Sequence, residues 1–221
     1  MKENVVMPKG LPRSWECVLA VLGLIILFPI LLICALLVRF SSPGPIFFRQ
    51  KRVGFKGRIF TLYKFRTMVE AKKGPLITAD GDRRITRIGR ILRKLKLDEL
   101  PEIYNVLRGD MALVGPRPEV PQYVDFSNPL WDRVLSVRPG ITDPVTLRLR
   151  NEEAFLAQVE DKERFYKEKI QPFKLKQSIK YLEKRSIKKD IKVIGKTFYV
   201  ILFPHTAPPP SVEEIQPSYL K

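Results

Sequence analysis

Residues 17–38 read CVLAVLGLIILFPILLICALLV, an apolar run of 22 positions without a charged side chain. As a helix rising ~1.5 Å per residue, the run would reach ~33 Å and cover a hydrocarbon core of ~30 Å. It is longer than the apolar region of a usual signal peptide, and no A-x-A-like cleavage site follows it. We therefore expect residues 1–40 to form a retained membrane anchor.

Pro29 and the flanking charges bear on how this anchor meets the bilayer. Pro29 is the thirteenth of the 22 positions, where it removes one helix hydrogen bond and bends the axis. Basic residues flank the run on both sides, which fits a single crossing poorly. A re-entrant helix that is broken at Pro29 and returns to the same face satisfies both flanks, and an ordinary kinked span is the alternative.

The composition limits the chemistry available to the chain. Its 221 residues carry 40 Lys and Arg against 23 Asp and Glu, a formal charge of +17. The single histidine, His205, lies in a proline-rich tail, which excludes a Ser-His-Asp triad, a Cys-His dyad and a histidine-rich zinc site. Cys17 and Cys34 lie inside the apolar run and are expected to be buried thiols. Catalysis would therefore depend on carboxylates, lysines, arginines or a metal held by oxygen.

The remainder of the chain predicts a mixed α+β domain over residues 41–203, followed by a proline-rich tail at 204–221. Residues 46–68 favour a small β-hairpin with its turn at 54–57. A helical period begins at Arg83, and a second helix is expected to end at Gly109. Two helices dense in charge are predicted at 151–169 and 172–184.

Residues 187–203 are expected to form an amphipathic helix. An apolar stripe (Ile187, Ile191, Ile194, Phe198, Ile201) lies opposite a lysine-rich side (Lys188, Lys189, Lys192, Lys196). This composition suits the plane of an anionic membrane, and it suits an amphipathic core helix equally well. The fold class is therefore α+β, with an N-terminal re-entrant helix, a hairpin and several amphipathic interfacial helices.

The most informative polar motif is LDELP at 97–101. Its adjacent carboxylates, Asp98 and Glu99, follow a segment with seven cations in fourteen residues (83–96). Because Pro101 favours the first turn of a helix, Asp98 or a close neighbour is expected to cap the second helix. The cations would keep both carboxylates ionised and attract phosphates, and one carboxylate could hold Mg²⁺ while the other acts as a nucleophile. The alternative is a plain helix cap with a solvated acid beside it.

Other motifs point to phosphate or exclude competing ligands. Arg117, between Pro116 and Pro118, could direct its guanidinium at a phosphate, and Arg138 before Pro139 repeats the pattern. A phosphate loop at 195–197 would require glycine at position 190, which holds an aspartate. The sequence has no zinc-finger spacing and no stacking platform, so nucleic acid is not an expected partner.

Eight short motifs occur in a characteristic order. They are Ser42-Pro43-Gly44-Pro45, Gln50 with Arg52 and Gly54, Lys64-Phe65-Arg66-Thr67-Met68, Leu97-Asp98-Glu99-Leu100-Pro101, Asn105-Val106-Leu107, Gly109-Asp110-Met111, Gly115-Pro116-Arg117-Pro118 and Arg138-Pro139-Gly140-Ile141-Thr142. Over residues 12–205 the chain resembles the bacterial sugar transferase family, the monotopic phosphoglycosyl transferases, in their small single-domain form.

This resemblance implies an activity and a set of site residues. The family transfers a phospho-sugar from a UDP-sugar to polyprenol (undecaprenyl) phosphate, giving a polyprenol diphosphate sugar and UMP and initiating glycoconjugate biosynthesis. By similarity Asp98 attacks the sugar-bearing phosphate and Glu99 holds Mg²⁺. Arg93 and Arg117 match arginines implicated in phosphate or nucleotide binding, and Lys64, Arg66 and Arg138, which lie in the matching motifs, are also predicted to bind substrate.

The resemblance also implies a location. The family's anchor is a re-entrant helix broken at a proline, which Pro29 matches, so residues 41–203 would form a catalytic domain on the cytoplasmic face of the bacterial inner membrane. Three departures stand out: Phe28 precedes Pro29, Arg13 follows Pro12 where a Lys-Arg pair is common, and Asp143-Pro144 replaces a frequent Gly-Trp. The last of these bears on sugar specificity.

Two alternatives stay open at the level of sequence. A membrane-anchored anion or nucleic-acid binder without catalysis would need only the +17 charge, and a membrane scaffold would turn over no small molecule. The sequence does not name the sugar or the downstream glycoconjugate, and it leaves assembly into a homo-oligomer open.

Overall fold

The computed structural model describes residues 8–69, 81–157, 159–203 and 215. In chain order its elements are α1 (Arg13–Ser41), β1 (Phe47–Val53), η1 (Phe55–Gly57), β2 (Ile59–Phe65), α2 (Arg87–Leu95), η2 (Leu97–Glu99), α3 (Glu102–Arg108), β3 (Ala112–Val114), η3 (Pro121–Tyr123), α4 (Pro129–Val134), β4 (Gly140–Thr142), α5 (Pro144–Arg148), α6 (Glu152–Ala157), α7 (Lys162–Phe165), η4 (Tyr166–Ile170), α8 (Gln171–Glu183) and α9 (Ile187–Leu202). The fold mixes helices and short strands, as the sequence predicts.

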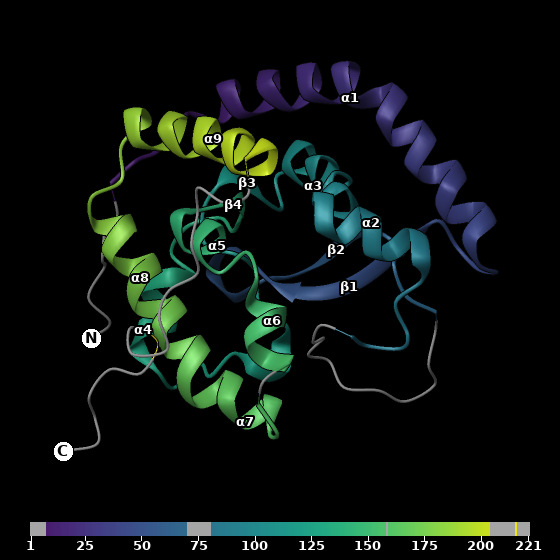
Figure 1. The fold of residues 1–221 in the computed structure, drawn as a ribbon. Helices are drawn as coiled ribbons and strands as arrows, with labels where there is room; N and C mark the ends of the chain where they lie inside the picture. The colour runs from purple at the N-terminus through teal and green to yellow at the C-terminus, as the bar shows by residue number, and fades with distance from the viewer. Residues whose placement is uncertain (1–7, 70–80, 158, 204–214, 216–221) are drawn as a thin grey trace.

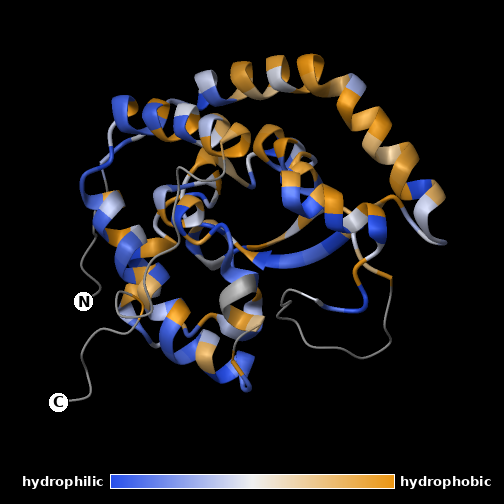
Figure 2. Ribbon diagram, in the orientation of Figure 1, coloured by the Kyte–Doolittle hydropathy of each residue, from blue (hydrophilic) through white to orange (hydrophobic). Residues whose placement is uncertain are grey.

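Helix α1 is the apolar anchor expected from the sequence. Its length and composition would allow it to cross a membrane. It continues through Pro29 without interruption and bends part-way along its length, arching over α9, α3 and α2 (Figure 1). Figure 2 colours most of its length as hydrophobic. Many of its apolar side chains are exposed, with Ile26 72% exposed. Such a surface suits contact with lipid, while a re-entrant path and a break at Pro29 stay predictions.

The hairpin predicted over 46–68 is confirmed. Strands β1 and β2 pair antiparallel from Phe47 opposite Phe65 to Val53 opposite Ile59. Lys56 and Gly57 adopt φ of 53° and 75° in the connection η1, a conformation that suits glycine. The amide of Asn105 on α3 bonds the backbone of β2, with its Nδ2 donating to the Thr61 carbonyl oxygen over 2.7 Å. This contact fixes α3 against the hairpin.

The basic helix α2 begins at Arg87, four residues later than predicted. Thr86 caps it by accepting a hydrogen bond from the Gly89 N–H over 2.8 Å, so residues 83–86 lie before the helix. At the other end Lys96 adopts a left-handed conformation with φ of 57° and ends the helix. The chain then turns through η2 before α3 starts.

The prediction that Asp98 or a close neighbour caps the second helix is wrong. Pro101 occupies the capping position of α3, and its side chain makes no capping hydrogen bond. The left-handed Lys96 places Asp98 in the turn η2, three residues before that position. The predicted end of the helix is confirmed, since Gly109 caps α3 with φ of 86°.

Two features of the second half were not predicted. Strands β3 and β4 pair in parallel, with Ala112 opposite Gly140 and Val114 opposite Thr142. The helix expected at 151–169 is divided into α6, α7 and the π-helical η4, because Asp161 accepts from the Arg164 N–H over 2.9 Å and starts a new helix. The described part of the expected tail is Ile215, which is buried among apolar side chains.

Helix α9 confirms the amphipathic segment but divides its apolar residues. Val193 and Val200 are buried against the domain, whereas Ile187, Ile191 and Phe198 are exposed. The helix lies beside the N-terminal part of α1 (Figure 1). The expectation of a core helix therefore holds for one side of α9, and contact of its exposed apolar side with a membrane surface stays a prediction.

Candidate active site

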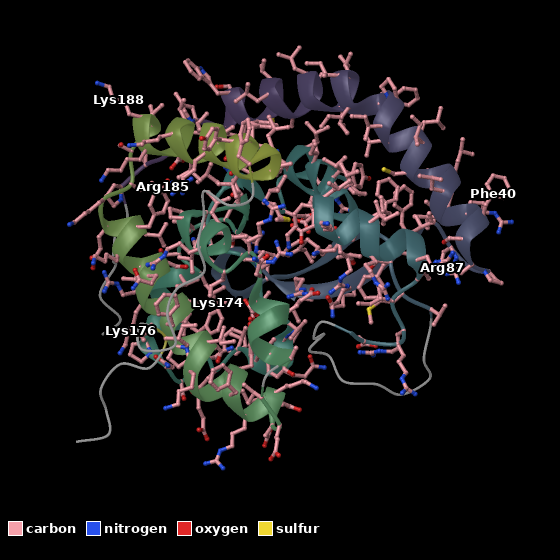
Figure 3. The ribbon with its side chains drawn as sticks, viewed as in Figure 1. Phe40, Arg87, Lys174, Lys176, Arg185 and Lys188 are labelled. Atoms are coloured by element: carbon pink, nitrogen blue, oxygen red, sulfur yellow. The ribbon has the colours of Figure 1, made fainter. Side chains whose placement is uncertain are left out.

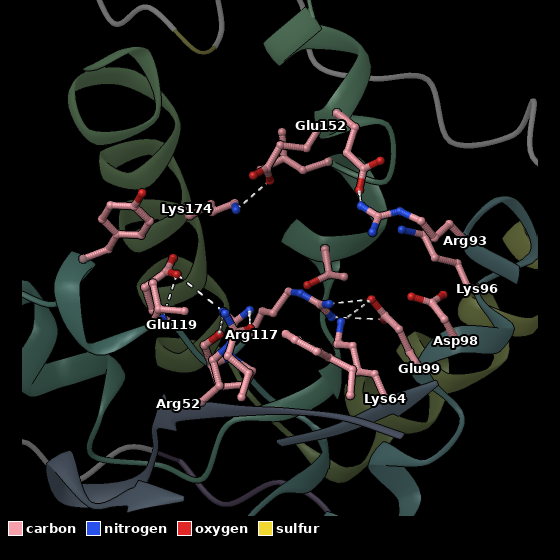
Figure 4. A pocket seen from close by; sticks show the side chains of 18 of the residues that line it. Arg52, Lys64, Arg93, Lys96, Asp98, Glu99, Arg117, Glu119, Glu152 and Lys174 are labelled. Atoms are coloured by element: carbon pink, nitrogen blue, oxygen red, sulfur yellow. Dashed lines mark hydrogen bonds and ion pairs between the residues drawn. The ribbon is translucent and has the colours of Figure 1, made fainter. Parts of the chain in front are cut away.

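A cavity of about 870 Å³ lies against the hairpin formed by β1 and β2. Its lining comes from β1, β2, η2, the loop at 116–119, and the helices α6 and α8. Figure 4 shows charged side chains from these separate segments directed into the same space. The cavity therefore gathers residues that are far apart in the sequence.

Asp98 lies on one side of this cavity. Only 7% of the residue is exposed, and its buried Oδ1 atom has no hydrogen-bond partner within the part of the chain that the structure describes. Burial raises the pKa of Asp98, and the neighbouring Glu99 raises it further, while Lys64, Lys96 and Arg93 oppose the shift. A buried carboxylate oxygen without a partner is costly in a fold, so it indicates a site for a ligand or for chemistry.

Glu99 is held by two cations. Lys64 Nζ lies 2.9 Å from Oε1, and Arg117 forms a fork in which Nη1 donates to Oε2 over 3.1 Å. Burial alone would raise the pKa of Glu99, but Arg117, Lys64 and Lys96 outweigh it and hold the pKa well below its usual range. Glu99 is consequently an ionised carboxylate in a fixed orientation.

Glu102 is a third carboxylate that the sequence interpretation missed. Its side chain is 1% exposed, and its Oε1 lies 3.3 Å from Lys64 Nζ. Apart from this ion pair, neither carboxylate oxygen of Glu102 has a hydrogen-bond partner among the described residues. Burial raises the pKa of Glu102, and Lys64 offsets this in part. The spacing Glu99 to Glu102 was the available signal, because three residues amount to about one turn.

Arg93 and Lys96 complete the cationic side of the cavity. Arg93 Nη1 donates to Thr67 Oγ1 over 3.4 Å, and Nη2 pairs with the carboxylate of Glu153 at the start of α6. Both cations lie beside Asp98 in Figure 4. The predicted residues Lys64, Arg93 and Arg117 are therefore brought together around the carboxylate pair, and Lys96 joins them.

Arg66 and Arg138 were predicted to bind substrate, but in this structure both contact the anchor helix α1. Arg66 lines the cavity, but its guanidinium donates to the carbonyl oxygens of Ser42 and Val38 over 2.6 and 3.2 Å, at the end of α1. Arg138 does not line the cavity, and its Nη2 lies 3.0 Å from Oε2 of the buried Glu16 near the start of α1. These two arginines attach the anchor to the domain.

The opposite side of the cavity carries a second polar group, which we call the far cluster (Arg52, Glu119, Glu152, Tyr166, Lys174). Lys174 Nζ lies 2.6 Å from Glu152 Oε2 and 3.3 Å from the Tyr166 hydroxyl. Tyr166 donates to Glu119, which pairs with Arg52. Arg117 lies between the far cluster and the carboxylate pair in Figure 4. The sequence interpretation assigned no site role to these residues.

The sequence model of one family, described as the bacterial sugar transferases, matches residues 8–204. The chain belongs to the bacterial sugar transferase family. Several relatives carry names of sugar-phosphate transferases. The UDP-N-acetylgalactosamine-undecaprenyl-phosphate N-acetylgalactosaminephosphotransferase of Aeromonas hydrophila is 43% identical over 135 residues, which cover 59% of this chain and 32% of that protein.

Two UDP-glucose:undecaprenyl-phosphate glucose-1-phosphate transferases are also similar to this sugar transferase. The protein of Caulobacter vibrioides is 43% identical over 141 residues, or 62% of this chain and 53% of that protein. The protein of Escherichia coli K12 is 34% identical over 195 residues, or 86% of this chain and 39% of that protein. The match thus spans about half or less of these relatives. The names of these three relatives describe transferases that act with a UDP-sugar and undecaprenyl phosphate.

The charges of this sugar transferase suit an anionic ligand. Arg93, Lys96 and Arg117 line the cavity together with Asp98, whose buried Oδ1 has no hydrogen-bond partner among the residues described. Among the described residues no three histidine, cysteine or acidic side chains group as a metal site. A divalent cation would therefore need further ligands from a bound substrate.

Proposed function

We propose that this chain transfers a phospho-sugar from a UDP-sugar to undecaprenyl phosphate and releases UMP. The observation that carries the proposal is the buried Asp98, which lines a cavity together with several cations and whose Oδ1 has no hydrogen-bond partner among the described residues. The names of the relatives support the substrate classes, since they pair UDP-sugars with undecaprenyl phosphate.

Asp98 acts as the nucleophile in a two-step reaction. Its carboxylate oxygen forms a bond to the sugar-bearing phosphorus, and the bond from that phosphorus to the UMP oxygen breaks, with UMP leaving as the anion. The phosphate oxygen of undecaprenyl phosphate then attacks the same phosphorus and displaces Asp98. Each step conserves charge, and the carboxylate is regenerated at the end.

The cations around Asp98 stabilise charge that develops on the phosphate oxygens. Arg93 exchanges its contact with Glu153 for a phosphate oxygen, and Arg117 keeps one face toward Glu99 while its remaining N–H groups reach the diphosphate. Once the substrate is bound, donors already held at the phosphate stabilise such charge strongly, because they need little reorganisation during the reaction. The ion pairs of Lys64 with Glu99 and Glu102 help to keep the charged side chains of the site in fixed positions.

The carboxylate pair suits Mg²⁺. Glu99 is ionised and keeps lone pairs beyond its contacts with Arg117 and Lys64, and the Oδ1 atom of Asp98 is unpartnered. Mg²⁺ prefers oxygen ligands and commonly combines one or two carboxylates with substrate phosphates. Glu99 would hold the ion, which supplies positive charge to offset that of the diphosphate.

The anchor places this site at a membrane surface. The exposed apolar side chains of α1 and α9 would lie in the bilayer, with the catalytic domain on the cytoplasmic face of the inner membrane. An excess of 17 positive charges favours an anionic leaflet, at roughly 1 kcal/mol per Lys or Arg near the surface. The phosphate group of undecaprenyl phosphate would then lie at the same level relative to the membrane as the cavity.

The test is Asp98→Asn, which keeps the shape of the side chain and removes the nucleophile. In full-length protein with UDP-sugar and undecaprenyl phosphate, this variant should release no UMP, whereas the matched surface control Asp125→Asn should turn over like the wild type. With labelled UDP-sugar and no acceptor, label should remain on the wild-type protein and be absent from Asp98→Asn. Retained turnover in Asp98→Asn would refute the role of Asp98 and favour another mechanism, whereas a wild type that releases no UMP would favour an anion binder without catalysis.

A further inference from the structure

The cavity extends beyond the residues around Asp98, where the reaction is proposed to take place. Its other half also carries polar side chains in fixed contacts. The far cluster faces the carboxylate pair across Arg117 (Figure 4). Lys174 comes from α8 and Glu152 from the start of α6, and their side chains are 23% and 21% exposed. Their ion pair is therefore mostly shielded from water and lies on the cavity wall. The proposed chemistry at Asp98 does not use these two residues.

The in-line geometry of phosphoryl transfer indicates which half of the substrate lies there. This step rests on the proposed function, with Asp98 as the nucleophile. The attacking and leaving oxygens lie roughly in line on opposite sides of the phosphorus. The leaving UMP therefore extends away from Asp98, past Arg117 and toward the far cluster, whereas the sugar projects to the side of that axis.

Beside the far cluster, part of the cavity wall is apolar. Tyr123, Val145, Leu149 and Leu156 line it and belong to one buried cluster with Tyr166. A nucleobase has two apolar faces that pack against such a wall, while a hexose presents hydroxyl groups in most directions. Apolar lining with a few polar groups is the usual composition of a site for a flat heterocycle. The wall therefore fits a nucleoside better than a sugar.

Lys174 and Glu152 offer the two kinds of contact that a vicinal diol needs. Lys174 uses two donors, on Glu152 and on the Tyr166 hydroxyl, which leaves one N–H for a ligand. Glu152 uses Oε2 for Lys174, and within the described residues its Oε1 has no hydrogen-bond partner. A carboxylate that accepts from ribose hydroxyls is a recurring arrangement in nucleotide sites.

We propose that Glu152 and Lys174 form the nucleoside subsite of this enzyme, in which Glu152 accepts from the ribose hydroxyls and Lys174 donates to them. The uracil then lies against the apolar wall. These two residues bind the leaving nucleotide and have no part in bond breaking. The subsite makes no contact with the sugar, so the choice of sugar is set elsewhere in the cavity.

The experiment measures UMP binding, because UMP contains the nucleoside and lacks the sugar. Full-length protein in detergent is titrated with UMP and with 2′,3′-dideoxy-UMP, for the wild type, Glu152→Gln and Lys174→Met. Lys176→Met is the matched control, since Lys176 lies on the same helix, is exposed and does not line the cavity (Figure 3). Isothermal titration calorimetry gives the Kd for each pair of protein and ligand.

The wild type should bind UMP about tenfold or more tightly than the dideoxy analogue, as expected for hydrogen bonds to charged groups. Glu152→Gln and Lys174→Met should each raise the Kd for UMP about tenfold and leave the Kd for the dideoxy analogue unchanged, and Lys176→Met should match the wild type. Equal wild-type affinity for the two ligands would overturn the proposal without any variant.

Two further outcomes separate this inference from the proposed function. If both variants bind UMP like the wild type but raise KM for the UDP-sugar, the far cluster contacts the sugar and the nucleoside assignment is wrong. If the wild type binds neither UMP nor its analogue, the proposed function fails, and the subsite fails with it.

Discussion

Replacing Lys64 by methionine should lower the free energy of unfolding, because it removes the positive charge beside two buried carboxylates. Lys64 Nζ lies 2.9 Å from Glu99 Oε1 and 3.3 Å from Glu102 Oε1. Glu99 would keep the fork of Arg117 after the substitution, whereas Glu102 has no other ion pair among the described residues. Its side chain is 1% exposed, so water cannot replace the lost ammonium. Lys64→Met therefore leaves the buried carboxylate of Glu102 without an ion-pair partner among the described residues.

The expected loss follows from the burial of Glu102. Removing one partner of a buried ion pair typically costs about 3–5 kcal/mol, because the other charge is left uncompensated. Burial already raises the pKa of Glu102 above its ordinary value near 4.5, and loss of Lys64 raises it further. The native variant then holds a proton that the unfolded chain releases, so its stability falls as the pH rises. The loss should be larger at pH 8 than at pH 5.

A double-mutant cycle with Glu102→Gln tests the cause. The amide removes the charge and keeps the shape, so Lys64→Met/Glu102→Gln should recover most of the loss, with a coupling energy of about 2 kcal/mol or more. Guanidinium unfolding of detergent-solubilised protein, followed by fluorescence of the buried Trp131, measures all four proteins. A loss below about 1 kcal/mol at pH 8, or no recovery in the double variant, would refute this reasoning.

Three further perturbations have defined outcomes. A methyl group on Gly89 would lie 2.0 Å from the carbonyl oxygen of Thr67, so Gly89→Ala should cost about 1–3 kcal/mol in thermal unfolding, and a variant as stable as the wild type would contradict that packing. Burial raises the pKa of Asp143, which caps α5 at the Thr146 N–H. Asp143→Asn should therefore stabilise the protein at neutral pH, with a gain that disappears as the pH falls to 3.8, the ordinary pKa of the group; a gain independent of pH would point to another cause. Chelation with EDTA should stop sugar-phosphate transfer and added Mg²⁺ should restore it, whereas full activity in EDTA would remove Glu99 as a metal ligand.

The parts of the fold that could be predicted depend on local signals. The hairpin followed from strand composition and a glycine turn, and the end of α3 followed from Gly109, whose φ of 86° suits glycine. The parallel pairing of Ala112 with Gly140 joins segments that carry no common signal, since each strand has only three residues. Pairing of this kind is decided by tertiary packing and could not be predicted from propensity.

The candidate site could be located where one motif gathers several charged residues. Adjacency and basic surroundings made Asp98 and Glu99 candidates, the family resemblance supplied the roles expected of them, and the structure brings Lys64 and Arg117 to them. A charged residue's type does not show which neighbour it will meet, so Arg138, predicted to bind substrate, is found paired with a buried glutamate at the anchor. For the same reason the partners Lys174 and Glu152, 22 positions apart in the sequence, could not be linked before folding.

The attachment of α1 at both ends has a consequence for how the acceptor reaches the enzyme. Arg138 holds Glu16 near the first turn, and Arg66 holds the carbonyl oxygens of Val38 and Ser42 at the last turn. With α1 in a bilayer, these ties prevent the domain from swinging out into the aqueous phase to collect its lipid. On the proposed function, undecaprenyl phosphate then diffuses laterally to a stationary opening, so turnover should follow the surface density of this lipid, in molecules per unit of membrane area.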